Sequence, residues 1–364
     1  MINGATDGKI RLSLRNVSAL FPTQFAAADA LFKEITMRRH VLERCSRRSA
    51  LSLVGASLAA PALGQTPCGF PLQDHVQGPR VWLNMDQEEL DAAYRQEVYQ
   101  PHIEEVTSRL SVASYDLRTR KGYPQRAEYG QNPDEALDIY KADASNAPVF
   151  VFIHGGTWRG LDAAKSGFAA ELFIDRGIQF VALDFSDVRR LDGDLGRLAG
   201  QVRRAIAWVV HNAQSFGGDP EKVYIGGHSS GGHLAAVVLT TDWTEFGLPS
   251  DAVKGGLCMS GMYDLAPVRL SWRRNYIAFT DEMEQDMSPQ RHLDRITAPV
   301  IVSFGTLETP EFQRQAKDFA AALTSAGKAA TLLVGPYLYH QDTWETLGNP
   351  YGMNGRAALA MIGG

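Results

Sequence analysis

A serine between two glycines lies near the middle of the chain, in the pentapeptide Gly227–Gly231, which reads Gly-His-Ser-Ser-Gly. It follows an apolar run at 223–225 and precedes a helical pattern, the strand–turn–helix context in which a G-x-S-x-G motif exposes a serine hydroxyl. The tight turn strains the serine backbone, and flanking glycines let the strand and the helix approach closely. These features predict that Ser229 is a nucleophile. Ser230 does not fit, because His228 would then stand where the first glycine belongs.

A pair of glycines, Gly155 and Gly156, follows His154 at the end of another apolar run, 149–153. Because glycine has no Cβ, the N–H groups of this pair can approach the oxyanion of a tetrahedral intermediate. The N–H of Ser230, the residue after the nucleophile, would join them. We therefore predict an oxyanion hole made by three backbone amides.

A serine hydroxyl needs a histidine to take its proton, and the histidine needs an acid to fix its tautomer. In folds with this motif the chain order is serine, acid, histidine. His340 follows the last predicted strand and is the only histidine after position 292, so we predict it as the base. His233 lies one turn into the helix after Ser229, and His292 precedes the strand that should supply the acid.

For the acid we select Glu308, which lies in the loop after the apolar run 300–304. Glu311 is the rival, although a carboxylate there is typical of the first turn of a helix. Asp342 is too close in sequence to His340, and Asp264 comes too early in the chain. The sequence thus predicts Ser229, Glu308 and His340 as a triad and leaves Glu311 as an alternative to Glu308.

The elements that must position these residues are short apolar runs that alternate with longer amphipathic ones. Such strands are typical of a parallel sheet that is buried on both faces. Strands that alternate with helices imply right-handed crossovers and an α/β sheet covered by helices on both sides. The predicted strands are 149–153, 180–183, 223–225, 257–259, 300–304 and 331–334, and the predicted helices include 202–213, 234–239 and 312–323.

Composition excludes several classes of protein and of partner. The chain has 364 residues, 45% of them hydrophobic, with 36 basic and 41 acidic side chains and a net charge of −5. Nothing in this balance favours nucleic acid or attachment to a membrane by charge. The three cysteines have no metal-ligand spacing, so neither a zinc site nor a disulfide framework is expected. Cys258 is expected to be a small buried hydrophobic residue, although its pairing with Cys68 stays open. The predicted reaction needs no metal and no organic cofactor.

The segment 37–64 has the order of features of a signal peptide. A basic stretch is followed by an uncharged run at 50–60, too short to span a bilayer, and then by the small-x-small pattern of Ala62–Gly64. Within it, Ser46–Leu51 resembles the twin-arginine export motif. We expect an exported protein, periplasmic or secreted, without stable membrane insertion, cleaved before Gln65. Residues 1–36 would be an upstream extension before a start at Met37.

Residues 65–85 are predicted as an extended arm or hairpin outside the core, because 67–84 is rich in glycine and proline but ends in an apolar run. Such an arm could serve as a lid or as a dimer contact. Asp86, three residues before Glu89, then indicates a capping box at the start of a helix. Leu90, Ala93, Tyr94 and Val98 would share one face of this helix. The catalytic domain is predicted to span 86–364.

Several stretches together resemble the α/β-hydrolase esterases of the hormone-sensitive-lipase and kynurenine-formamidase kind. They are 152–161 (FIHGGTWRGL), 216–234 (FGGDPEKVYIGGHSSGGHL), 260–267 (SGMYDLAP), 308–315 (ETPEFQRQ) and the region of His340. The resemblance implies the α/β-hydrolase fold, the same triad and the same oxyanion hole. Thr157, Glu308 and Gln341 depart from residues usual in formamidases. The whole chain looks most like bacterial carboxylesterases that de-esterify sulfonylurea herbicides, which implies a homodimer whose N-terminal hairpin covers the partner's active site.

The segment 270–287 either walls a roomy pocket for an aromatic ester or packs as surface helices. Trp272 and Tyr276 in this segment, with Trp158 and His228, are the candidate substrate contacts. We expect a serine carboxylesterase that forms an acyl-enzyme from a small-molecule ester, such as an aryl methyl or ethyl ester. An arylformamidase with the same triad and a non-catalytic binding module are the alternatives.

Overall fold

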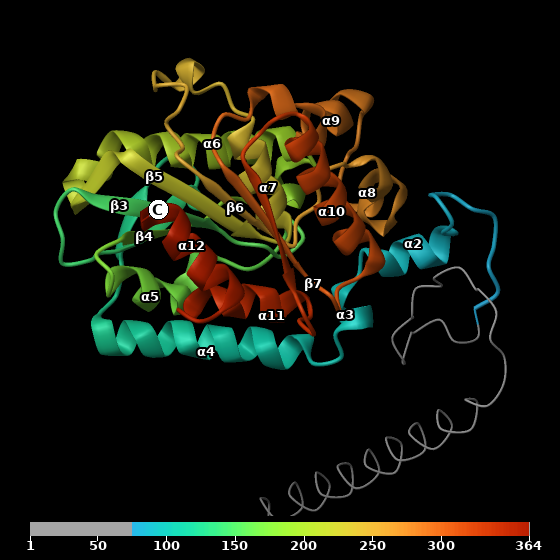
Figure 1. Ribbon diagram of the computed structural model, residues 1–364, viewed down its shortest axis with the longest axis horizontal. Helices are drawn as coiled ribbons and strands as arrows, with labels where there is room; N and C mark the ends of the chain where they lie inside the picture. The colour runs from blue at the N-terminus through green and yellow to red at the C-terminus, as the bar shows by residue number, and fades with distance from the viewer. Residues whose placement is uncertain (1–74, 364) are drawn as a thin grey trace, which may run out of the picture. The chain divides into compact units, whose positions relative to one another are not determined.

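The computed structural model describes residues 75–363, which build an eight-stranded sheet in the order β1-β2-β4-β3-β5-β6-β7-β8 (Figure 1). Neighbouring strands from β4 to β8 are parallel, whereas β1 and β2 are antiparallel to their neighbours. The strands are β1 Gln125–Glu128, β2 Ala136–Tyr140, β3 Ala147–Ile153, β4 Gln179–Leu183, β5 Gly218–His228, β6 Gly256–Met259, β7 Val300–Gly305 and β8 Ala330–Gly335. The predicted mostly parallel α/β sheet is confirmed.

Each of the six predicted strands lies within an observed strand, but their burial differs from the prediction in one case. Strand β8 is at the edge of the sheet, and Leu332 and Val334 on it are 38% and 47% exposed. The prediction that it is buried on both faces was wrong, because the layers that cover the inner strands leave the side chains of this last strand partly open to solvent. Strands β1 and β2 were not predicted, since β1 is polar and β2 carries Asp138, which pairs with Arg126.

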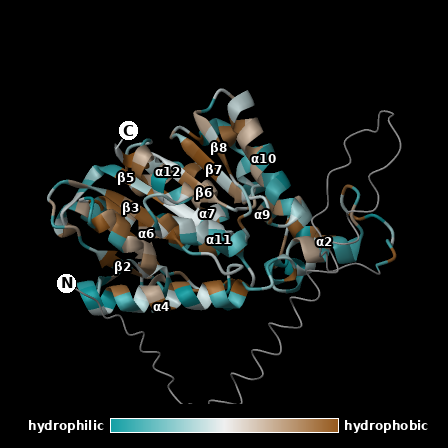
Figure 2. Ribbon diagram, turned by 60° about the horizontal axis from the view of Figure 1, so that its bottom comes forward, coloured by the Kyte–Doolittle hydropathy of each residue, from teal (hydrophilic) through white to brown (hydrophobic). Residues whose placement is uncertain are grey.

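Helices cover both faces of the sheet, as predicted. Helices α4, α5, α11 and α12 lie together on one side, and α6, α9 and α10 lie on the other (Figure 1). The helices of the described residues are α2 Gln87–Ala93, α3 Gln96–Tyr99, α4 Ile103–Lys121, α5 Ala170–Ile174, α6 Leu195–Asn212, α7 Ser230–Leu239, α8 Ala266–Leu270, α9 Asp281–Asp286, α10 Pro310–Ser325, α11 His340–Glu345 and α12 Met353–Gly363. Figure 2 shows hydrophobic colour concentrated on the inner strands and a mixed pattern along α4.

Alternate residues of β3 pack into two separate hydrophobic cores, one on each face of the sheet. Val149, Val151 and Ile153 pack with α6, α7 and α10, whereas Phe150 and Phe152 pack with α4 and α5. This alternation follows from the period of two along a strand. The sheet is thus fixed from both sides, and the ends of its strands become a rigid platform for loops.

The capping box at Asp86 is present, but the helix that it begins is shorter than predicted. Helix α2 ends at Ala93, and Val98 lies in the separate helix α3. The chain turns at Tyr94 because its carbonyl accepts hydrogen bonds from Trp272 Nε1 and Arg273 Nη2, both at 3.3 Å, instead of from a helical N–H.

The described part of the N-terminal arm, residues 75–85, ends in a tight turn closed by a bridge between Trp82 and Met85. The remainder of the arm, the predicted signal segment 37–64 and Cys68 lie outside the described residues. Cys258 is buried in β6 as a free thiol. Among the described helices, none combines the length and the apolar character needed to cross a membrane.

Candidate active site

Ser229 occupies the sharp turn between β5 and α7, with φ 59° and ψ −122°. This backbone conformation is rare for a residue with a side chain. A Cβ at Gly227 would collide with the carbonyl of Gly231, and a Cβ at Gly231 would collide with the carbonyl of Ile153. The two glycines of the motif are therefore required by the close approach of strand and helix, as the sequence predicts.

The side chain of Ser229 lines a cavity of about 140 Å³. Within the described residues no hydrogen bond engages its hydroxyl. The other lining residues are Tyr94, Gln96, Glu97, Ile103, Gly156, Thr157, Arg159, Leu161, His228, Trp272, Arg273, His340 and Gln341. Since pockets for drug-sized ligands measure about 300–1,000 Å³, this cavity suits a small acyl or alcohol group. The segment 270–287 contributes Trp272 and Arg273 to this cavity. Its later residues, between Ala278 and Met287, line a separate cavity of about 620 Å³ that does not include Ser229.

His340, the first residue of α11, lines the same cavity, and Glu308 lies behind it in the turn between β7 and α10. The Nδ1–H of His340 donates to Oε2 of Glu308 at 2.9 Å. Both side chains are buried. This bond leaves Nε2 as the nitrogen able to accept a proton, and no partner in the described part of the chain occupies it. A nucleophile and its base often come into hydrogen-bond contact only in the substrate complex.

Two further groups hold the carboxylate of Glu308. The hydroxyl of Ser260 donates to Oε1 at 2.6 Å, and the N–H of Gly305 donates to the same oxygen at 2.7 Å. Ser260 also contacts the hydroxyl of Thr343 at 2.8 Å, which connects the carboxylate to α11. Sequence reasoning did not identify Ser260, although its place directly after β6 was a usable signal.

Burial has the largest effect on the pKa values of Glu308 and His340. Desolvation raises the pKa of Glu308 to about 7, against the effect of the Ser260 hydroxyl. Desolvation also lowers the pKa of His340 to about 3, and the positive charge of Arg273 adds to this effect. The imidazole is therefore neutral at neutral pH, and its protonation at Nε2 depends on the charge of Glu308, which stabilises the imidazolium.

The rival acids lie elsewhere. Glu311 is buried in the first turn of α10, where both its oxygens pair with Arg314 at 2.8 Å. Asp342 accepts from the N–H of Tyr339 in a capping box, and Asp264 pairs with Arg291. The structure thus brings Glu308, and not Glu311, to His340.

Three of the other histidines also have structural partners. His233 contacts the Met287 carbonyl at 2.8 Å and accepts from Trp158 Nε1 at 3.3 Å, and burial lowers its pKa to about 4. His292 is half-buried and contacts the carbonyl of Gln285. His228 lines the cavity, and its Nε2–H donates to the backbone carbonyl of His340 at 2.9 Å, so it holds the base in place from behind.

The predicted oxyanion amides lie in two loops that meet beside Ser229. Gly156 lines the cavity, and a Cβ at Gly155 would lie 2.7 Å from the carbonyl of His228. Ser230 begins α7, where N–H groups have no intrahelical acceptor. Its hydroxyl accepts from the N–H of Trp158 at 3.1 Å and so ties the two loops together.

The candidate substrate contacts divide into two groups. Trp272 and His228 line the cavity, but Trp158 and Tyr276 do not. Trp158 is buried beneath the site, and the Tyr276 ring stacks under the guanidinium of Arg159 at 4.1 Å. Sequence reasoning missed Tyr94 and Arg273, which lie more than 170 positions apart in sequence and meet in the wall of the cavity.

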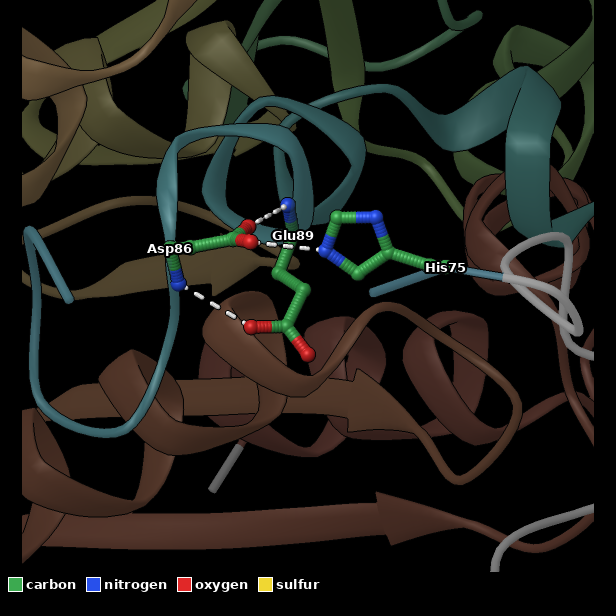
Figure 3. Close-up of side chains that lie close together, drawn as sticks. All are labelled: His75, Asp86 and Glu89. Atoms are coloured by element: carbon green, nitrogen blue, oxygen red, sulfur yellow. Dashed lines mark hydrogen bonds and ion pairs between the residues drawn. The ribbon is translucent and has the colours of Figure 1, made fainter. Parts of the chain in front are cut away.

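His75, Asp86 and Glu89 form a cluster with candidate metal-ligand atoms within 4.8 Å of one another (Figure 3). The oxygens of Asp86 accept from the N–H groups of Glu89 and Gly78 and from His75, and a Glu89 oxygen accepts from the N–H of Asp86. These bonds are explained by the capping of α2 and by attachment of the arm to it. No other such group occurs among residues 75–363.

Comparisons with known proteins agree with this geometry. A family model described as BD-FAE matches residues 137–254, and one described as the prolyl oligopeptidase family matches residues 197–347. A kynurenine formamidase of Danio rerio is 30% identical over 263 residues, which cover 68% of this chain and 86% of that protein. An isoprenylcysteine alpha-carbonyl methylesterase of Arabidopsis thaliana is 26% identical over 59% of this chain and 55% of that protein.

Among solved structures, a putative thioesterase from Silicibacter sp. aligns with a TM-score of 0.65 and 21% identity. The alignment covers 76% of this chain and 99% of that one. At this identity the likeness bears on the fold, and it supports the α/β-hydrolase architecture described above.

Proposed function

Because the chain belongs to the kynurenine formamidase family of α/β-hydrolases and is a hydrolase, we propose that it cleaves carboxylic esters through an acyl-enzyme. The observation that carries the proposal is the 2.9 Å hydrogen bond between His340 and Glu308 beside a cavity that Ser229 also lines. It supplies a nucleophile, a neutral base and an orienting acid in one site.

In the proposed reaction, Oγ of Ser229 attacks the ester carbonyl while its proton passes to Nε2 of His340. The carboxylate of Glu308 stabilises the imidazolium that forms. The amides of Gly155, Gly156 and Ser230 donate to the oxyanion. The proton then goes to the departing alcohol, and a water molecule, activated by the same histidine, releases the acid and restores the serine.

The first test is Ser229→Ala, assayed with phenyl acetate. Removal of the nucleophile should lower kcat by about 10⁶-fold, as in other serine hydrolases, without loss of the folded state seen by circular dichroism. A fluorophosphonate probe should label the wild-type protein at Ser229. Retained turnover in the variant, or an unlabelled wild-type protein, would exclude this mechanism and would favour a binding module.

Hydrolysis of an aryl formamide is the second candidate, favoured by the 30% identity to the Danio rerio protein. The match to a methylesterase favours esters. The deciding measurement is kcat/KM for N-formylkynurenine against phenyl acetate and methyl and ethyl aryl esters, with a sulfonylurea methyl ester among them. A preference of tenfold or more for the formamide would replace the ester proposal.

A further inference from the structure

Arg273 is a buried cation in the wall of the candidate active site. It lies in the short helical turn Trp272–Asn275 and is 1% exposed. Its guanidinium carbon lies 5.2 to 5.8 Å from the ring centres of Trp158, Trp272 and Tyr94. These rings remove water from the charge and hold its plane in a fixed place.

The hydrogen bonds of this guanidinium are few and long. Nη2 donates to the Tyr94 carbonyl at 3.3 Å, Nη1 donates to the Tyr276 hydroxyl at 3.4 Å, and Nε has no partner. Across residues 75–363 no carboxylate lies within salt-bridge distance of it. By contrast, the half-buried Arg314 pairs with both Glu311 and Asp318. A buried charge is normally paired with an opposite charge. The guanidinium of Arg273 is not, so it can still bind an anion.

The position of this cation is that of a substrate contact. Arg273 lines the cavity together with Ser229 and His340, and its charge contributes to the lowered pKa of His340. The other acids near it are not positioned to neutralise it. Glu308 is bound by His340 and Ser260, and Glu97, which also lines the cavity, has an exposed side chain.

We propose that the substrate of this site carries a carboxylate or another monoanionic group, which pairs with the guanidinium of Arg273. The inference rests on the proposed function, because it names the class of ester that Ser229 cleaves. A guanidinium presents a planar fork of donors that matches a carboxylate, and water exclusion strengthens such a pair. The small cavity holds the anion close to the scissile bond, so the acyl or the alcohol part must be compact.

The test uses two matched pairs of esters. In the first, 3-acetoxybenzoate is compared with phenyl acetate, so that the anion is on the leaving group. In the second, the monoanionic 4-nitrophenyl succinate is compared with 4-nitrophenyl butyrate, so that the anion is on the acyl group. Each kcat/KM is divided by the hydroxide-catalysed rate of the same ester to remove differences in intrinsic reactivity.

We expect the wild-type protein to prefer the anionic member of at least one pair by tenfold or more. Arg273→Gln should reduce that preference by at least tenfold, and Arg273→Lys should retain part of it. Arg274→Gln is the matched control, because Arg274 is the exposed neighbour that contacts Gln87, and it should leave the preference unchanged. If Arg273→Gln does not fold, inhibition of the wild-type protein is measured instead. The proposal then predicts competitive inhibition by 3-hydroxybenzoate and none by phenol.

A wild-type preference for the neutral member of both pairs would overturn the proposal. So would an unchanged preference in a folded Arg273→Gln variant, or a loss of preference only in Arg159→Gln, since Arg159 lines the same cavity. Failure of the proposed function would look different, because none of the four esters would then be turned over in a Ser229-dependent way.

Discussion

Two histidine–carboxylate pairs of similar geometry lie in different parts of this molecule. In the candidate active site, His340 and Glu308 are 2.9 Å apart, and at the start of α2, His75 and Asp86 are 2.7 Å apart. Burial lowers the pKa of His340 to about 3 and raises that of Glu308 to about 7. At α2 the shifts are reversed, because hydrogen bonding raises the pKa of His75 and lowers that of Asp86 to about 2.

The difference lies in what surrounds each pair. Two backbone N–H groups, of Glu89 and Gly78, stabilise the charged form of Asp86 near the surface, whereas Glu308 receives one, from Gly305, within the interior. The surface pair is therefore an ion pair that fastens a segment, and the interior pair is a neutral base with an acid behind it. Contact distance alone does not separate a structural pair from a catalytic one.

The largest effect should come from exchanging each acid for its amide. Glu308→Gln keeps an acceptor for Ser260 and Gly305, but its NH₂ group faces Nδ1 of His340 and moves the histidine proton to Nε2. This is the wrong tautomer for a base, so kcat should fall by about 10⁴-fold. Asp86→Asn, which keeps a good N-cap, should leave kcat within about twofold of wild type. Phenyl acetate turnover measures both, and equal losses in the two variants would contradict the comparison.

The same two variants should differ in the sign of their pH-dependent stability. The raised pKa of Glu308 means that the folded state loses stability as the pH rises from the ordinary carboxyl value through about 7. The melting temperature of Glu308→Gln relative to wild type should therefore increase over this range. The lowered pKa of Asp86 stabilises the folded state above the ordinary value and ceases to do so as the pH falls to about 2. The deficit of Asp86→Asn should accordingly shrink as the pH falls from 5 toward 2.

A smaller effect is expected from Ser260→Ala, which removes the 2.6 Å hydrogen bond to Glu308. That bond favours the ionised carboxylate, so its loss should raise the pKa of Glu308 further. The acidic limb of kcat/KM should move to higher pH by about one to two units, since a hydrogen bond to a charged group is worth about 1.5–3 kcal/mol and one pKa unit corresponds to about 1.4 kcal/mol. Ser303→Ala is the control, because the buried Ser303 hydroxyl has no partner. If the acidic limb of the pH profile shifts equally in Ser260→Ala and Ser303→Ala, Ser260 acts only through packing.

Local geometry explains how much of the site the sequence predicts. The strained turn at Ser229 is encoded in five consecutive residues, because only glycine tolerates the contacts at Gly227 and Gly231. His340 and Glu308 follow from strand order, since the ends of parallel strands share one edge of the sheet. The five predicted strands β3 to β7 were visible as apolar runs because they lie inside the sheet and are buried, whereas β8 was visible as an apolar run although it lies at the edge.

What the sequence did not predict depends on contacts between distant segments. Arg273 enters the cavity because the chain turns at Tyr94, and neither residue carries a local signal for that contact. Strand β2 contains Asp138, whose charge is balanced within the sheet by Arg126 from β1 and Arg118 from α4. Ser260 acquires its role from Glu308 and Thr343, which are 48 and 83 positions away.

The smallest effect should appear at the surface pair, where His75 attaches the arm to α2. The raised pKa of His75 means that its attraction to Asp86 and Glu88 is fully present below the ordinary histidine value of about 6.5 and is lost as the pH rises through the raised value. Hydrogen-exchange protection of residues 75–85, corrected for intrinsic rates, should fall about two- to fivefold between pH 6 and pH 9. His75→Gln should remove this pH dependence and leave kcat unchanged, because neither His75 nor Asp86 lines the cavity that holds Ser229. Peptides from α6 provide the internal control. Constant protection in the wild-type protein, or the same fall in His75→Gln, would show that the surface pair does not hold the arm by charge.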